Sequence, residues 1–163
     1  MDIGLNIVEG LRISMGDSLE NIVNDMNKSG VKYTIPFSST VNGKSEIIIL
    51  IESYGVELKM QNDAVSFIKT SNSQLNLMAT IKSTQPNEVL REVLDATAQR
   101  FDIPASKLRV DRFEAKTNNC VISIPYKRHE KIKMVFIMGG HNQLFVETIQ
   151  LIPNTIHKVK NRQ

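Results

Sequence analysis

The side chains that most often act as nucleophiles or metal ligands are scarce in this chain. It has one cysteine, Cys120, and three histidines at positions 129, 141 and 157. Cys120 begins the apolar segment 120–124, which is typical of a core strand, whereas a catalytic thiolate needs an electropositive, partly exposed place. The scattered histidines lack the spacing of a zinc site. We therefore expect no catalytic thiol, no metal ion and no other cofactor.

One four-residue motif matches a catalytic signature. The segment Gly-Asp-Ser-Leu at 16–19 resembles the GDSL motif of SGNH-type esterases, and this resemblance implies Ser18 as the nucleophile. Such a serine needs a histidine base oriented by a carboxylate, which that family supplies as a late Asp-x-x-His pair. Here Tyr126, Met138 and Asn154 stand three residues before the histidines. The motif also fits the start of an amphipathic helix.

Positive charge gathers in the second half of the chain. Residues 1–83 carry a net charge of −2 and residues 84–163 carry +5. Four cations are predicted on one hairpin, two at its tip and two along an exposed strand face: Lys127, Arg128, Lys131 and Lys133. Three more could extend this patch: Arg109, Arg112 and Lys116. The patch fits contact with phosphate or with an acidic protein, or else a solvated surface that protects a sheet edge.

The first half predicts a helix followed by an antiparallel sheet. Apolar residues at positions 19, 22, 23 and 26 form one helical face. Asp17 is the expected N-cap, Glu20 completes a capping box and Gly30 ends the helix. A short strand over 10–14 precedes it. Four strands follow, joined by loops too short for parallel crossovers, at 31–37, 46–52, 56–60 and 64–70.

Three of these strands carry signals about exposure. Pro36 is expected to end the first strand. The second strand contains five consecutive aliphatic residues, 47–51, and is predicted to be covered on both faces. In the third strand, Glu57 and Lys59 alternate with apolar residues, so both are expected to face water and are candidate partner contacts. The Asn-Asp pair at 62–63 has the chemistry of a hairpin turn.

The second half repeats this order of elements. A strand over 75–82 leads to a helix that follows Ser83 and Thr84, with Pro86 in its first turn. Its apolar stripe is predicted at positions 90, 94, 98 and 101, with valines at 89 and 93 beside it. Residues 102–104 break the helix. Four strands follow, at 107–113, 119–126, 131–138 and 143–152.

These elements predict an α+β fold with two helices packed on a curved antiparallel sheet, whose other face is partly free. Equivalent strand positions in the two halves lie 74–76 residues apart, although few residues are identical. Two explanations stay open: a tandem α-β-β-β-β duplication over 1–72 and 73–152, or one α+β domain whose halves match by accident. The chain is expected to form a single domain over 1–163 that ends in a basic tail, 153–163.

Composition limits the class of protein. With 41% apolar and 23% charged residues over 163 positions, the chain is an ordinary globular sequence, not a disordered chain, a collagen or a coiled-coil rod. No apolar run reaches the roughly 20 residues that span a bilayer. The N-terminus lacks the pattern of a signal peptide, and a lone cysteine suits a reducing compartment. We expect a cytoplasmic protein that does not bind membranes.

The layout resembles that of known inhibitors. A short α+β chain without catalytic motifs is similar to the small cytosolic immunity proteins that neutralise bacterial toxins. The tandem plan is also similar to that of a β-lactamase inhibitory protein, which grips an enzyme with a concave sheet. The resemblance implies a non-catalytic protein-binding module that blocks a toxin or enzyme, and the basic charge favours an acidic partner surface. It rests on layout alone, so no site residue is carried over.

Two other functions stay open. A nucleic-acid-binding module would use the basic second half, and a sheet of two repeats could saddle a duplex as a TATA-binding-like fold does. Aromatic residues make up only 6% of the chain and none is tryptophan, which gives little support to stacking on single strands. The third function is the esterase with Ser18 as nucleophile.

Overall fold

The computed structural model describes residues 2–114 and 119–154, and the chain divides into two compact units, 2–77 and 78–163. We name them the N-terminal unit and the C-terminal unit. The predicted class is confirmed, because the fold is α+β and consecutive strands pair in antiparallel fashion. No helix in the described part of the chain is long and apolar enough to cross a membrane.

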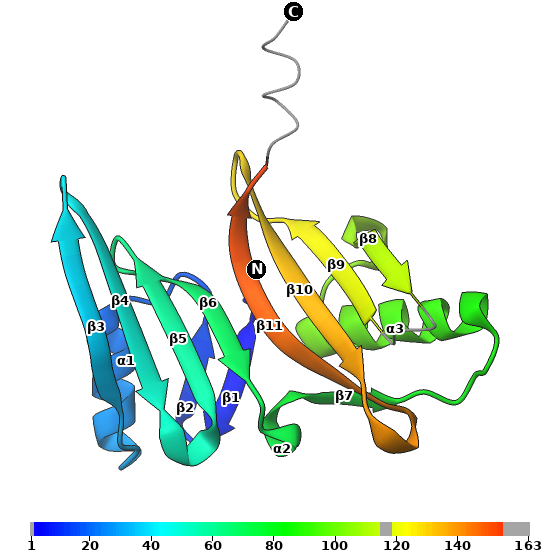
Figure 1. Cartoon of the computed structure of the whole chain (residues 1–163), viewed down its shortest axis with the longest axis horizontal. Coiled ribbons are helices and arrows are strands. Elements are labelled where there is room, and N and C mark those ends of the chain that lie inside the picture. Colours follow the sequence, from blue (N-terminus) through cyan, green and yellow to red (C-terminus); the bar gives the residue numbers. More distant parts are fainter. Residues whose placement is uncertain (1, 115–118, 155–163) are drawn as a thin grey trace, which may run out of the picture. The chain divides into compact units, whose positions relative to one another are not determined.

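The N-terminal unit has a sheet in one layer and a hairpin and a helix in the other (Figure 1). Its elements are β1 (Gly4–Val8), β2 (Leu11–Ser14), α1 (Leu19–Lys28), β3 (Thr34–Val41), β4 (Lys44–Ile51), β5 (Val56–Gln61), β6 (Ala64–Thr70) and α2 (Ser73–Asn76). β3 to β6 form an antiparallel meander, and the β1–β2 hairpin and α1 lie on one of its faces. Strand β1 and helix α2 were not predicted.

Alternation along the strands builds the core of this unit. One cross-strand row contains Ile49, Leu58 and Ile68, all buried. In the second layer, the inward residues of α1 and of the hairpin are equally buried, among them Ile22, Met26, Leu5 and Ile13. Apolar side chains with a period of two on the strands and of about 3.6 on the helix therefore meet in one core.

The residues that flank α1 explain where the helix begins and ends. Its N-cap is Ser18, whose hydroxyl accepts a hydrogen bond from the Asn21 backbone N–H at 3.2 Å. The prediction of Asp17 as N-cap is wrong, because the Asp17 carboxylate accepts from the Ser14 backbone N–H at 2.8 Å and closes the preceding turn. Gly30, with φ of 68°, follows the C-cap as predicted.

Two strand predictions are corrected by the pairing in this sheet. β3 does not end at Pro36 but continues to Val41, because its register with β4 shifts between Thr34 and Phe37 and accommodates the proline at this irregularity. β4 is not covered on both faces. Ile49 and Ile51 are buried, whereas the alternate residues Ile48 and Leu50 are only half-buried on the opposite face.

The C-terminal unit also places a helix on one face of a four-stranded meander (Figure 1). Its elements are β7 (Leu77–Thr80, which begins at the unit boundary), α3 (Pro86–Phe101), β8 (Arg109–Glu114), β9 (Asn119–Pro125), β10 (Glu130–Met138) and β11 (Gln143–Pro153). β8 to β11 pair in order, and β7 pairs with β11. The expectation of two helices is incomplete, since the structure adds the four-residue helix α2.

Helix α3 buries part of its predicted face, Phe101 and the neighbouring Val93, together with Thr97, which was not predicted. Pro86 occupies the first turn as expected, and the fully buried residues are Val93, Thr97 and Phe101. The predicted positions 90, 94 and 98 are half-buried beside them. Thr97 tolerates burial because its hydroxyl donates to the Val93 carbonyl at 2.7 Å. The periodicity of apolar residues does not predict the burial of such a threonine.

The end of the chain is described only in part. β11 ends at Pro153, one residue later than predicted, and Asn154 donates its backbone N–H to the His129 carbonyl at 2.8 Å. The remainder of the predicted basic tail, 155–163, lies outside the described residues. Lys116, the third residue expected to extend the basic patch, also lies outside them.

Candidate functional site

The C-terminal unit has one sheet face under α3 and an opposite face made of outward-pointing residues. On the covered face, Ile122, Met134 and Ile149 form a buried cross-strand row. The strand registers place two adjacent outward rows on the other face: Arg109–Ser123–Lys133–Gln150 and Arg112–Val121–Val135–Thr148. A third row continues them: Glu114–Asn119–Ile137–Phe145. We name this surface the cationic face; it includes Lys131, which is opposite Pro125 and Ile152.

The cationic face combines unpaired positive charge with half-exposed apolar side chains. Arg112 donates from Nε to Glu114 Oε1 at 2.6 Å. Arg109, Lys131 and Lys133 have no ion pair within the described parts of the chain. Ser123, between Arg109 and Lys133 in its row, is only 1% exposed. Cross-strand neighbours lie about 5 Å apart, so the aliphatic stems of the two long cations can shelter this small residue.

The predicted cations on one hairpin do lie together. Lys131 and Lys133 are on β10 within the cationic face, and Lys127 and Arg128 are exposed in the turn between β9 and β10. The Lys127 ammonium lies 5.5 Å from the centroid of the Tyr126 ring. This turn therefore extends the positive charge of the face beyond the end of the strands.

The N-terminal unit also has an outward sheet face, opposite α1. Its central rows are Phe37–Ile48–Lys59–Phe67 and Thr34–Leu50–Glu57–Lys69. The predicted contacts Glu57 and Lys59 are both on this face and half-exposed. The Lys59 ammonium lies 4.7 Å from the centroid of the Phe67 ring, and Glu57 stands between Leu50 and Lys69 in its row. In its central rows this surface carries both signs of charge, whereas the cationic face has Glu114 at the end of its third row, where it is paired with Arg112.

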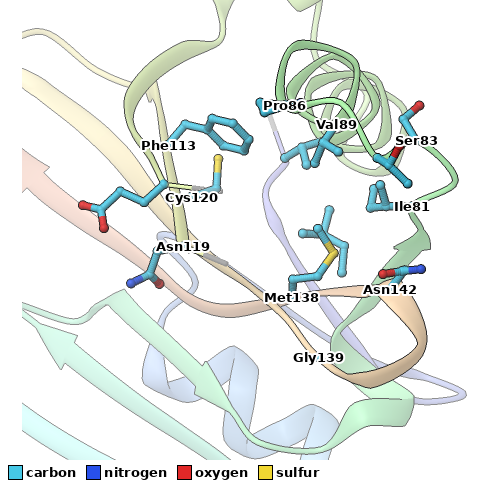
Figure 2. A pocket seen from close by; sticks show the side chains of 14 residues that line it. Ile81, Ser83, Pro86, Val89, Phe113, Asn119, Cys120, Met138, Gly139 and Asn142 are labelled. Carbon is cyan, nitrogen blue, oxygen red and sulfur yellow. The ribbon is translucent and has the colours of Figure 1, made fainter. Parts of the chain in front are cut away.

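A cavity of about 300 Å³ lies inside the C-terminal unit, between the start of α3 and the sheet (Figure 2). Phe113 and Cys120 form one wall, and Pro86 and Val89 of α3 form another. Met138 and Asn142, at the β10–β11 connection, close the cavity from below in this view. Its lining is mainly apolar, with serine, threonine, asparagine and one carboxylate at its margin.

Two titratable groups in this region have shifted pKa values, one of which favours the neutral form and the other the ionised form. Burial raises the pKa of the Cys120 thiol to about 11, so it is protonated at neutral pH. This is the reverse of what a catalytic thiol requires. The pKa of Glu92 is lowered, first by a hydrogen bond from the Ser83 side chain and then by the Lys82 backbone N–H. Its oxygens accept from the backbone N–H groups of Lys82 and Ser83 at 2.9 and 2.8 Å, which ties the β7–α3 connection to the helix.

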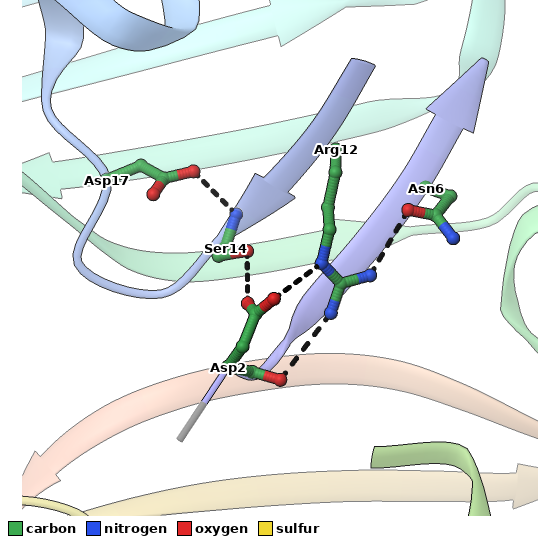
Figure 3. A network of polar contacts seen from close by, with 5 residues as sticks. All are labelled: Asp2, Asn6, Arg12, Ser14 and Asp17. Atoms are coloured by element: carbon green, nitrogen blue, oxygen red, sulfur yellow. Dashed lines mark hydrogen bonds and ion pairs between the residues drawn. The ribbon is translucent and has the colours of Figure 1, made fainter. Parts of the chain in front are cut away.

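A network of polar side chains links the two strands of the β1–β2 hairpin to Asp2 (Figure 3). The Asp2 carboxylate accepts from the Ser14 hydroxyl at 2.5 Å and from Arg12 Nε at 3.1 Å. The hydrogen bond from Ser14 is the main cause of the lowered pKa of Asp2. Arg12 also donates to the Asn6 side-chain oxygen at 3.2 Å. These contacts stabilise the hairpin, and both carboxylate oxygens of Asp2 accept a hydrogen bond.

Ser18, the predicted nucleophile of the esterase hypothesis, is the N-cap of α1. Its hydroxyl caps α1, and the sequence of its unit, 2–77, contains no histidine that could act as a base there. The esterase function therefore has no base within the unit that holds the serine. Among the described residues there is also no group of three or more histidine, cysteine or acidic side chains that could hold a metal ion.

Sequence reasoning missed the apolar half of both outward faces. The cationic face includes Val121, Val135 and Phe145, and the other unit presents Phe37 and Ile48. The alternation of β9 and β10 carried the signal, since every second residue from 121 and from 131 onward shares the face of Lys133.

Comparisons of this chain with protein-family models, with curated proteins and with solved structures found no match.

Proposed function

We propose that this protein is a non-catalytic binding module that holds an acidic surface of a partner protein against its cationic face. The single observation behind this proposal is the composition of that face. Arg109, Lys131 and Lys133 have no ion pair within the described residues, and the half-buried Val121 and Val135 lie in the next row of the same sheet face. Charge steers a partner of opposite sign, and burial of the apolar centre supplies affinity.

The finer role that we propose is inhibition, in which the partner is a toxin or another enzyme and binding blocks it. The support is the resemblance of the layout to immunity proteins and to a β-lactamase inhibitory protein, together with an outward sheet face in each unit. We also propose a cytoplasmic location, because the single cysteine suits a reducing compartment.

A tandem duplication is part of the same proposal. Each unit runs from a short strand to a helix and then to a four-stranded meander, with β2 and β7 before α1 and α3. The first three meander strands begin at nearly constant offsets: Thr34 to Arg109 is 75 residues, Lys44 to Asn119 is 75, and Val56 to Glu130 is 74. The fourth pair, Ala64 to Gln143, is offset by 79 residues. The boundary between the units, after residue 77, would then replace the boundary after residue 72 that the sequence suggested.

The experiment captures partners from a lysate of the source organism on three immobilised proteins. These are the wild type, Lys131→Glu/Lys133→Glu, and the matched control Lys32→Glu/Arg91→Glu, whose exposed cations lie outside the cationic face. We expect one protein to bind the wild type and the control in near-equal amounts, resist nuclease and be lost from the first variant. Retention of that partner by all three proteins would overturn the proposed surface.

Once the partner is identified, its association kinetics give a sharper test. Reversal of two steering charges should lower the association rate constant by about tenfold or more at low salt, because such charges act mainly on the encounter. The wild-type rate constant should also fall as salt rises, since exposed charges are screened over about 10 Å at 0.1 M. Equal rate constants for wild type and variant would show that the cations are only solvated.

Nucleic acid is the second candidate, because the same three cations could contact phosphates. The captured material would then be removed by nuclease, and the logarithm of its binding constant would fall linearly with the logarithm of the salt concentration. We favour a protein because the third outward row includes Ile137 and Phe145, which phosphate contact does not use.

A further inference from the structure

Strand β3 has a free long side. It pairs with β4 in the N-terminal unit, and in the described residues no other strand pairs with it. The backbone N–H and C=O groups along such an edge can pair with another extended chain. Natural edge strands are protected from this by charged side chains, by proline, by bulges or by shortness.

The protection of β3 is incomplete. Its residues 34–41 include no charged side chain, whereas the edge strand β8 of the C-terminal unit carries Arg109, Asp111, Arg112 and Glu114. Pro36 and the register shift between Thr34 and Phe37 protect the first part of β3. From Phe37 to Val41 the register with β4 is regular, so this segment is an edge without a bulge and without charge.

Exposed apolar side chains concentrate on the same strand. Ile35, Phe37 and Val41 are 42%, 44% and 62% exposed, and they are three of the six large apolar side chains that the described part of the chain exposes. Phe37 also begins the outward row that continues through Ile48 to Lys59. An uncharged edge with exposed apolar residues is a surface that usually has a partner.

We propose that the occupant of this edge is a second copy of the chain, paired antiparallel with β3 around a two-fold axis at Ser39. In this register Phe37 of each copy is opposite Val41 of the other, so the two exposed apolar residues cover each other. The pairing is self-complementary, which a closed two-fold interface requires. This inference is independent of the proposed partner on the cationic face.

The ends of the segment and the neighbouring charges fit this register. Pro36 of one copy would meet the turn residue Asn42 of the other, so the pairing is limited to five residues, the usual strand length. The nearest carboxylates are those of Glu46, which is opposite Ser39 on β4. Two intervening strands would separate the two Glu46 backbones by about 14 Å, beyond the screening length at physiological salt.

Sedimentation equilibrium over a concentration range up to about 1 mM measures the dimer. We expect the wild type to dimerise. Ser39→Lys places two ammonium groups opposite each other at the axis and should weaken dimerisation at least about fivefold. The matched control Ser106→Lys, an exposed position in the C-terminal unit, should leave it unchanged. A wild type that is monomeric throughout, or a Ser39→Lys variant that dimerises as well as the wild type, would overturn the proposal.

Cysteine cross-linking tests the register without a change of charge. The natural Cys120 is only 4% exposed, so a single introduced cysteine is the reactive thiol. Ser39→Cys should give a covalent dimer on mild oxidation, because the two residues 39 are direct neighbours in this register. Thr34→Cys on the same strand should not, since the two residues 34 would lie about 33 Å apart. Cross-linking at residue 34 in place of residue 39 would contradict the register.

Discussion

At the scale of single residues, burial and hydrogen bonding decide what each reactive side chain can do. Cys120 faces a largely apolar cavity, which keeps its thiol protonated. Glu92 is held in the ionised form by donors from Ser83 and Lys82. Ser18 serves as a helix cap. These three residues include the two nucleophiles that the sequence singled out, and both have structural surroundings.

The raised pKa of Cys120 makes a prediction about stability at high pH. Because the pKa is raised from an ordinary value near 9 to about 11 in the folded protein, the stabilising effect is full below pH 9 and is lost between pH 9 and 11. Over that range, the free energy of unfolding of the wild type should fall relative to Cys120→Ala by about 1–2 kcal/mol.

Urea unfolding of both proteins at pH 7, 9 and 11 measures this difference. The comparison with Cys120→Ala removes the contribution of every other group that titrates in the range. Thiol labelling at pH 8 provides a second readout, which should be slow in the folded chain and fast in urea. Parallel pH profiles for the two proteins would contradict the assignment.

At the scale of elements, local chemistry and packing agree for most of the chain. The turns at 62–63 and at 42–43 have positive φ at both residues, as a tight hairpin requires.

The β1–β2 hairpin depends on a close approach of its backbones. A Cβ atom at Gly4 would clash with the Ile13 carbonyl oxygen and would lie 2.6 Å from Ser14 Cα. Only glycine fits here, although the backbone itself is extended.

Gly4→Ala should therefore destabilise the protein by about 2 kcal/mol or more, because the new methyl group would meet backbone atoms of Ile13 and Ser14, which cannot rotate away. Thermal or urea unfolding measures the loss. Gly140→Ala is the matched control: no atom lies within 4 Å of its Cβ position, so the change should be within about 0.5 kcal/mol. Equal stability of the two variants would show that the hairpin can separate at no cost.

At the scale of the whole molecule, the chain consists of two units of opposite net charge. Residues 2–77 carry −3 and residues 78–163 carry +6. In the N-terminal unit, buried side chains from the hairpin, from α1 and from the sheet supply a core to which each element contributes. The net positive charge on which the proposed acidic partner depends belongs to the C-terminal unit.

We expect the 76-residue fragment 2–77 to fold by itself, because its own helix, hairpin and four strands supply the residues of one core. Its stability should be modest, since a domain of this size buries only about 60% of the surface of its unfolded chain. Amide NMR shifts of β3 to β5 should match those in the full chain. The shorter fragment 2–63, which lacks β6 and the buried residues Val65 and Ile68, should remain unfolded. A disordered spectrum for 2–77 would contradict this expectation.

Much of the fold could be predicted because the strongest signals are local. The strand at 64–70 was predicted with its observed bounds, and the start of α3 was correctly assigned from Pro86. β1 was missed although Leu5, Asn6 and Ile7 alternate, because the strand has only five residues and the alternation ends at Val8. On α3, the burial of Phe101 and Val93 was predicted but that of Thr97 was missed, because a hydrogen bond to the Val93 carbonyl permits it and sequence periodicity does not register such a bond.

The candidate site could be predicted only in part for a related reason. The exposure of Lys131 and Lys133 followed from their alternation with apolar neighbours, which is a property of a single strand. The row that joins Arg109, Ser123 and Lys133 depends on pairing between three strands, and bulges shift that pairing at residues 111 and 147. A shift of one residue moves a side chain to the other face of the sheet. The residues that make up the cationic face therefore could not be predicted from the sequence.

The sequence by itself determined the class of this protein, the order of its helices and strands apart from β1 and α2, and the gathering of positive charge in its second half. These properties depend on composition and on periods of two and about 3.6, which are local. Only the tertiary structure decided which cations share a face, which side chains neighbour them, and that β3 has an uncharged free edge. Those properties depend on strand register and on contacts between residues far apart in the chain, where small shifts exchange buried and exposed positions.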